Sequence, residues 1–236
     1  MNRAVEANLA MIRHVASRLG HLREQVVFLG GAATALLITD TAAPDVRVTT
    51  DVDVIVKTAS RGDYYRFAKS LRSSGFTEDS RDGAPLCRWL VDGIAVDVMP
   101  TDEEILGFSN QWYPQAVQLA TVRVISEDMA IRVVTAPYFL ATKIDAFYNR
   151  GAGDFIASHD IEDIITLLDG RSEIVEEVRI APDVLKEFLS RKFDEFLQYR
   201  SFLDALPGHL LPDLASQQRI PILMERIRAI ANICQL

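Results

Sequence analysis

Cysteine, basic charge and long apolar runs are all scarce in this sequence. Its 236 residues include two cysteines, Cys87 and Cys234, which are too few and too far apart to indicate a disulfide framework or a metal cluster. This low content favours a reducing cytoplasm. The net charge is −8, so a broad basic face for nucleic acid is not expected. No apolar run reaches the roughly 20 residues that span a bilayer, and scattered charges in the first 20 residues argue against a signal peptide or membrane anchor.

The spacing of apolar and turn residues predicts an α/β first half and a helical second half. The elements expected in the first half are helices over 3–19, 32–38 and 64–74, strands over 26–29, 46–56, 122–126 and 131–134, and a hairpin of 86–91 with 94–99. An Asp-Gly turn at Asp92 joins the hairpin strands. Helices are expected over 137–149, 160–169, 183–205 and 220–233. The character changes near residue 135, so two domains are predicted, residues 1–135 and 136–236.

Two acids, Asp51 and Asp53, interrupt an apolar strand-like run in RVTTDVDVIV. Residues i and i+2 of a strand project to the same face, roughly 7 Å apart. Like charges so placed repel unless a cation lies between them. Asp97, in IAVDVMP, is a third acid on a separate predicted strand with apolar neighbours. Because Mg²⁺ binds oxygen ligands and keeps substrate phosphates in its shell, the three acids predict a shared Mg²⁺ site. Acids on edge strands that face solvent are the alternative.

A glycine pair, Gly30 and Gly31, stands between a predicted strand and a predicted helix. Such a turn exposes backbone N–H groups at the positive end of the helix, and glycine lets a phosphate approach the backbone closely. Arg47, upstream of the acids, has two interpretations, a phosphate ligand or a partner of the acids. Thr49 also has two, a hydrogen-bond donor that orients an Asp carboxylate or a residue that simply favours a strand.

Two cations of the helical half, Lys143 and Arg150, are seven residues apart and therefore share a helix face. Two cations on one face suit a triphosphate, since arginine can hold oxygens bidentately. The alternative is a solvated basic stripe paired with Asp145 or Asp154.

A helix start is predicted at Ser158, whose side chain can cap the first turn. Asp160 and Asp163 follow, and acids in the first turn of a helix complement its dipole. His159 is interpreted as a surface residue.

The combination of these motifs resembles the nucleotidyltransferase superfamily, which has the polymerase-β-like fold. The first motif is Gly-Gly, then Arg-x-Thr-x-Asp-x-Asp, then a later Asp between apolar residues. The second, Lys-x-x-Ala-x-x-x-Arg followed by Asp-x-x-Asp, is similar to the AbiEii-like branch, known as toxins of type IV toxin–antitoxin and abortive-infection systems. Many members have Arg where this chain has His159. The resemblance covers roughly residues 26–170 and is carried by Gly30, Gly31, Arg47, Thr49, Asp51, Asp53, Asp97, Lys143, Ala146, Arg150, Asp160 and Asp163.

The resemblance implies an α+β fold, in which a mixed sheet with flanking helices precedes a helical domain. It implies that Asp51, Asp53 and Asp97 hold two Mg²⁺ ions and that a nucleoside triphosphate such as ATP donates a nucleotidyl group. Triphosphate contacts are expected from Gly30, Gly31, Arg47, Thr49, Lys143 and Arg150, and a second-domain contact from Asp160 and Asp163.

The acceptor is left open as a tRNA end, another protein or a small molecule, and an antitoxin is an expected partner. Two alternatives stay open. One is an aminoglycoside-type enzyme, which the acidic composition favours because cationic drugs need an acidic cleft. The other is a non-catalytic module that binds nucleotide or an antitoxin.

Overall fold

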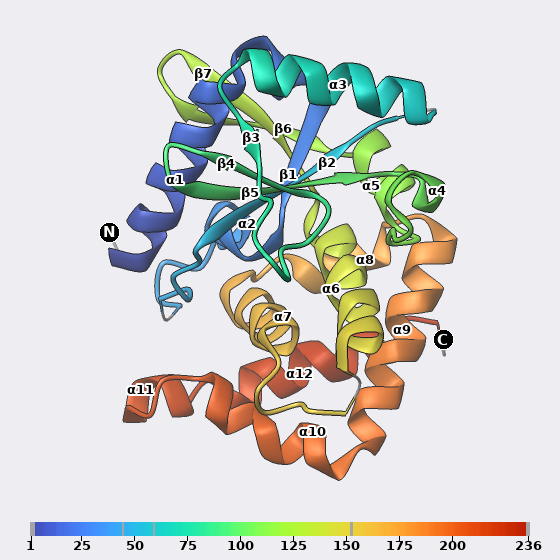
Figure 1. Cartoon of the computed structure of the whole chain (residues 1–236). Coiled ribbons are helices and arrows are strands. Elements are labelled where there is room, and N and C mark those ends of the chain that lie inside the picture. Colours follow the sequence, from blue (N-terminus) through green and yellow to red (C-terminus); the bar gives the residue numbers. More distant parts are fainter. Residues whose placement is uncertain (1–2, 44, 59, 152, 235–236) are drawn as a thin grey trace. The chain divides into compact units, whose positions relative to one another are not determined.

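The computed structural model describes residues 3–43, 45–58, 60–151 and 153–234. They form two compact units (Figure 1), one of Met1–Leu36 with Asp45–Thr135 and one of Leu37–Pro44 with Ala136–Leu236. The predicted domains, 1–135 and 136–236, placed Leu37–Pro44 in the first domain, whereas in the structure this segment belongs to the second unit.

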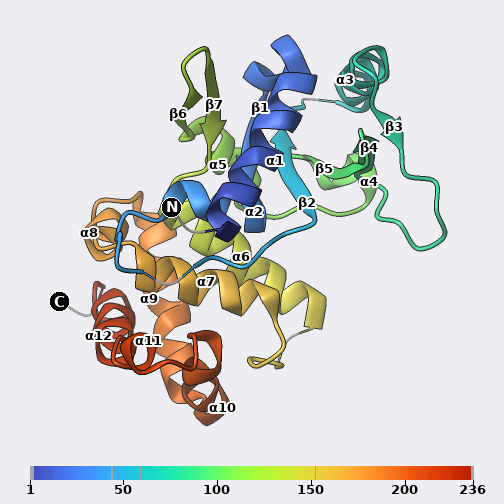
Figure 2. The ribbon, with the colours of Figure 1, turned by 90° about the vertical axis from the view of Figure 1, so that its left-hand side faces the viewer.

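A seven-stranded sheet forms the centre of the first unit, with strand order β3-β4-β5-β2-β1-β7-β6. Two neighbouring pairs, β2 with β5 and β1 with β7, are parallel, and the others are antiparallel. Figure 2 shows the β6–β7 hairpin toward one end of the sheet and β3 with β4 toward the other. The expected α+β class with a mixed sheet is confirmed. The strands are β1 Val26–Leu29, β2 Asp51–Val56, β3 Thr77–Glu78, β4 Arg88–Val91, β5 Ile94–Pro100, β6 Thr121–Ser126 and β7 Met129–Val133.

The two longest helices of the first unit, α1 and α3, each bury an apolar stripe, as amphipathic periodicity requires. The helix α1 buries Ile12, Val15 and Leu19. The helix α3 begins earlier than the predicted residue 64, because the Ser60 side chain accepts a hydrogen bond from the Asp63 N–H and so caps the first turn. The helical segments are α1 Arg3–Leu19, the 3₁₀ helix η1 Gly20–Gln25, α2 Gly30–Leu37, α3 Arg61–Ser73, α4 Glu103–Leu106 and α5 Tyr113–Gln118.

The hairpin of β4 and β5 sets the register of the strand that carries Asp97. Both turn residues have positive φ, 48° at Asp92 and 83° at Gly93, as a two-residue type I′ turn requires. The turn pairs Val91 with Ile94 and, three steps further along the ladder, Arg88 with Asp97.

The second unit is helical, and its core is rich in phenylalanine. Rings of Phe147, Phe155 and Phe202 lie 5.0 to 6.2 Å from that of Phe196. A single helix was expected over 183–205, but the extended backbone of Tyr199, with φ −86° and ψ 114°, divides it. The helical segments are α6 Ala136–Gly151, α7 His159–Gly170, α8 Ile174–Arg179, α9 Asp183–Gln198, α10 Arg200–Ala205, the 3₁₀ helix η2 Leu206–His209, α11 Leu214–Gln217 and α12 Ile220–Ala231. Among the described residues, no helix is both long and apolar enough to cross a membrane.

A polar cluster attaches the segment after α2 to this helical unit. The Arg219 guanidinium lies 2.6 Å from the Asp40 carboxylate and 2.8 Å from that of Asp169, whose side chain is 2% exposed. The N–H groups of Thr39 and Asp40 both donate to the Gly170 carbonyl at 2.9 Å. These contacts explain why Leu37–Pro44 belongs to the helical unit, although it follows α2 directly.

Candidate active site

Three carboxylates share one face of the sheet in the first unit. Strands β2 and β5 are parallel neighbours, and their register places Asp53 directly beside Asp97 and Asp51 beside Ala95. Paired residues of neighbouring strands project to the same face, and so do residues i and i+2 of one strand. The structure therefore brings together the three acids that the sequence singled out.

Two of these acids, Asp97 and Asp51, contact Arg88, a cation that the sequence analysis did not select. Its Nε and Nη2 atoms each lie 2.8 Å from one oxygen of Asp97, and Nη2 also lies 3.0 Å from Oδ2 of Asp51. The hydrogen bond to Asp97 raises the pKa of Arg88. The signal that could have identified Arg88 is the Asp92-Gly93 turn, because a two-residue hairpin loop places Arg88 opposite Asp97.

Carboxylate oxygens are the ligands that Mg²⁺ prefers, so the chemistry of Asp51, Asp53 and Asp97 suits the predicted ion. The arrangement of these three side chains does not suit the ion. In the part of the chain that the structure describes, no three His, Cys, Asp or Glu side chains form a group that could hold a metal ion. The Arg88 guanidinium instead contacts both oxygens of Asp97 and one of Asp51. With Arg88 in this place, the three acids do not form a metal site.

The glycine pair makes room for side chains of this site. Gly30, the first residue of α2, has φ +74°, and a Cβ atom built on it would lie 1.8 Å from Oδ2 of Asp53. A Cβ atom on Gly31 would lie 2.4 Å from Nη2 of Arg47 and 2.8 Å from Cγ2 of Thr49. The Asp53 carboxylate therefore lies against the start of α2, where the helix dipole favours negative charge. Any side chain at Gly30 displaces it.

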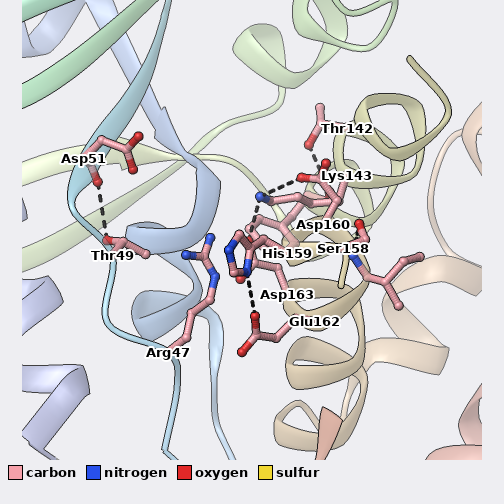
Figure 3. A network of polar contacts seen from close by, with 12 residues as sticks. Arg47, Thr49, Asp51, Thr142, Lys143, Ser158, His159, Asp160, Glu162 and Asp163 are labelled. Atoms are coloured by element: carbon pink, nitrogen blue, oxygen red, sulfur yellow. Dashed lines mark hydrogen bonds and ion pairs between the residues drawn. The ribbon is translucent and has the colours of Figure 1, made fainter. Parts of the chain in front are cut away.

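A second residue that the sequence analysis missed, Asn8 of α1, holds the chain before β2. Its Oδ1 atom accepts a hydrogen bond from the Thr49 N–H at 3.1 Å, and its Nδ2 atom donates to the Arg47 carbonyl at 2.9 Å. The Thr49 hydroxyl donates to the main-chain carbonyl of Asp51 at 3.4 Å (Figure 3). The predicted strand 46–56 was too long, because its first residues bond to the Asn8 side chain and β2 begins at Asp51.

The second group of predicted site residues lies in the helical unit, and most of the charged side chains in this group form ion pairs. The Lys143 ammonium lies 2.6 Å from Asp163 and 3.2 Å from Asp160, and Lys143 is 11% exposed (Figure 3). Arg150, 70% exposed, lies 3.2 Å from the same Asp160 carboxylate. The two cations thus share a helix face, as expected, and share Asp160 as an ion-pair partner.

The start of α7 follows the predicted capping pattern. The Ser158 hydroxyl accepts a hydrogen bond from the Ile161 N–H at 3.3 Å. The His159 side chain is 74% exposed and lies 3.0 Å from Glu162 (Figure 3), so its interpretation as a surface residue is confirmed.

Comparisons with known proteins give remote structural similarities only. No family model and no curated protein matches the chain. The chain is similar to an antigenic nucleotidyltransferase-like protein from Paracoccidioides brasiliensis, with 20% identity, 95% of this chain and 93% of that chain covered, and a TM-score of 0.49. It is also similar to JHP933 from Helicobacter pylori, with 12% identity, 100% and 92% covered, and a TM-score of 0.47.

Proposed function

We propose that this protein is a cytoplasmic enzyme that transfers a nucleotidyl group from a nucleoside triphosphate to an acceptor, with Mg²⁺ as the required ion. The observation that carries the proposal is the row of Asp51, Asp53 and Asp97 across two parallel strands, with the start of α2 against Asp53. Three acids on one sheet face repel one another, so the site suits a ligand that brings positive charge, such as a nucleotide with its Mg²⁺. The motifs that resemble the nucleotidyltransferase superfamily include these same three acids.

The roles proposed for individual residues follow from their chemistry. Asp51 and Asp53 bind the nucleotide through its Mg²⁺, and Asp97 also helps to activate the acceptor hydroxyl. When bound, Mg²⁺ would be held by Asp51, Asp53 and Asp97 and would supply charge neutralisation for the phosphates. Because Arg88 lies among the acids, we propose that Mg²⁺ arrives with the nucleotide. In the first unit, the residues proposed to contact the triphosphate are Gly30, Gly31, Arg47 and Thr49. In the second unit, Lys143 and Arg150 are proposed as phosphate ligands, and their ion-pair partners are Asp160 and Asp163.

The acceptor is proposed to be an RNA end, a protein or a small molecule, and a labelling experiment separates the three. Nucleoside triphosphates with ³²P at the α-phosphate are incubated with Mg²⁺ and with total RNA, a cell protein extract or an aminoglycoside panel. The net charge of −8 supports a cationic acceptor such as an aminoglycoside. The matched control is Asp53→Asn, which keeps the side-chain shape but removes the charge. Label transferred equally by both proteins would refute the assignment of Asp53.

A role as the toxin of a toxin–antitoxin pair is the finer proposal, supported by the resemblance of the Lys143 and Arg150 segment to the AbiEii-like branch. Induced expression of the wild-type protein is then expected to arrest growth, and Asp53→Asn is expected to be harmless at the same protein level. Arrest by both proteins would refute a toxic transferase activity.

The second candidate function is a non-catalytic nucleotide-binding module, and the contacts of Arg88 favour it. A guanidinium paired with two of the three acids can make a metal unnecessary for folding. Calorimetry with nucleoside triphosphates, with and without Mg²⁺, distinguishes the two functions. Binding that is independent of Mg²⁺, with no label transferred to any acceptor, favours the module over the enzyme.

A further inference from the structure

The acidic face of the sheet already has a cation of its own. Arg88 forms a bidentate pair with Asp97 and a third contact with Asp51, and its side chain is 24% exposed. A planar guanidinium pairs with a carboxylate at both oxygens, which makes such a pair stronger than a single contact. The position of Arg88 is fixed by its place opposite Asp97 in the hairpin of β4 and β5.

A divalent cation needs the same oxygen atoms. Both oxygens of Asp97 and Oδ2 of Asp51 accept hydrogen bonds from Arg88. A metal ion coordinated by Asp97 would lie within a few ångströms of the guanidinium, where two positive charges repel strongly in a partly buried site. The metal and Arg88 therefore compete for Asp97 and Asp51.

We propose that Arg88 is the resident counter-ion of the acidic site and that a divalent cation binds only when the Arg88 guanidinium leaves Asp97 and Asp51. This inference rests on the proposed function, since it concerns the ion which that function requires. It assigns Arg88 as a positioning residue that holds the carboxylates together before the nucleotide and its ion arrive. In the absence of nucleotide, Arg88 then keeps the affinity of the site for a metal ion low.

The test is binding of Mn²⁺ alone, without nucleotide, followed by the electron paramagnetic resonance signal of the free ion. We expect Arg88→Gln to bind Mn²⁺ about tenfold more tightly than the wild type, or better, because a competing unit charge is removed. Arg88→Lys keeps the charge but loses the bidentate geometry, so its affinity should fall between the two. The matched control is Arg66→Gln, which removes the same charge from the same unit at a 75% exposed side chain paired with Asp63. It should bind Mn²⁺ as the wild type does.

Equal Mn²⁺ affinity for the wild type and Arg88→Gln would overturn this inference and leave the proposed Mg²⁺ dependence standing. Weaker binding by Arg88→Gln would also overturn it. No Mn²⁺ binding by any of the proteins at millimolar concentration would overturn this inference alone, because in the proposed function the ion arrives with the nucleotide.

Arg88→Gln leaves two carboxylates without their partner and can fail to fold, so a second measurement uses the wild-type protein. The ¹⁵N signal of the Arg88 Nε–H group, assigned by its loss in Arg88→Lys, should shift when Mg²⁺ is added. An unchanged Arg88 signal under conditions in which Mg²⁺ binds would overturn the inference.

Discussion

Replacing Gly30 by alanine is the sharpest structural test of the acidic site. The residue has φ +74°, a conformation that costs an L-residue about 1–2 kcal/mol. The added Cβ atom would also lie 1.8 Å from Oδ2 of Asp53, whereas real Cβ atoms keep at least 3.0 Å, so the carboxylate must move by at least 3.0 − 1.8 = 1.2 Å. Forcing such a shift in a packed site costs about 1–3 kcal/mol more.

The control that separates strain from the clash is Gly107→Ala. Gly107 has φ +82°, but nothing lies within 4 Å of a Cβ atom built on it. Urea unfolding followed by circular dichroism should give a loss of about 1–2 kcal/mol for Gly107→Ala and about 2–5 kcal/mol for Gly30→Ala.

A double-mutant cycle with Asp53→Ala locates the clash. That change removes the two closest atoms, Oδ2 and Cγ, and leaves Cβ of Asp53 at 2.8 Å. The loss in Gly30→Ala/Asp53→Ala should be smaller than the sum of the single losses by about 1–2 kcal/mol. Additive losses, together with equal losses for Gly30→Ala and Gly107→Ala, would refute the contact between Gly30 and Asp53.

Three further predictions concern buried groups. Arg219→Ala should lower the free energy of unfolding by about 3–5 kcal/mol, because it leaves the buried Asp169 carboxylate unpaired. The control Arg200→Ala, at an 86% exposed side chain, should lower it by less than about 0.5 kcal/mol. Equal losses for the two variants would contradict the prediction. Burial, reinforced by the charges of nearby acids, raises the pKa of Cys87 from 9.0 to about 12, so the folded state holds this proton more tightly than the unfolded state. The contribution of this group to the free energy of unfolding is complete below pH 9 and should be lost as pH rises toward 12. The Cys87→Ala variant should lack this pH dependence. A thiol reagent at neutral pH should modify Cys234, which is exposed, and reach Cys87 only after unfolding; equal rates would contradict the burial.

Local signals in the sequence predicted much of the sheet. The strand 26–29 and the hairpin at Asp92-Gly93 lie where apolar runs and turn residues indicated. The common face of the three acids followed from the alternation of a strand, since Asp51 and Asp53 are two residues apart and the parallel register adds Asp97. The glycine pair was located correctly, but its place in the first turn of α2 was not predicted.

Contacts between distant segments account for what could not be predicted. The Asn8 side chain decides where β2 begins, and no periodicity within residues 46–56 reveals a partner some 40 residues earlier. Arg88 has an ordinary strand context, and only its pairing partner makes it part of the site. The interruption at Tyr199 carries no glycine or proline, and the ring of this residue packs 5.7 Å from that of Phe155, a contact between remote parts of the helical unit.

The measurement that tests the central claim most directly compares nucleoside triphosphates labelled with ³²P at the α- or the γ-phosphate. Each is incubated with Mg²⁺, a cell extract as the source of acceptors, and either the wild-type protein or Asp53→Asn. Nucleotidyl transfer moves the α-phosphate and releases the γ-phosphate with pyrophosphate. We therefore expect the wild type to attach the α-label to an acceptor, the γ-label to stay unattached, and Asp53→Asn to attach neither. Attachment of the γ-label alone, or of no label by the wild type, would contradict the proposed reaction.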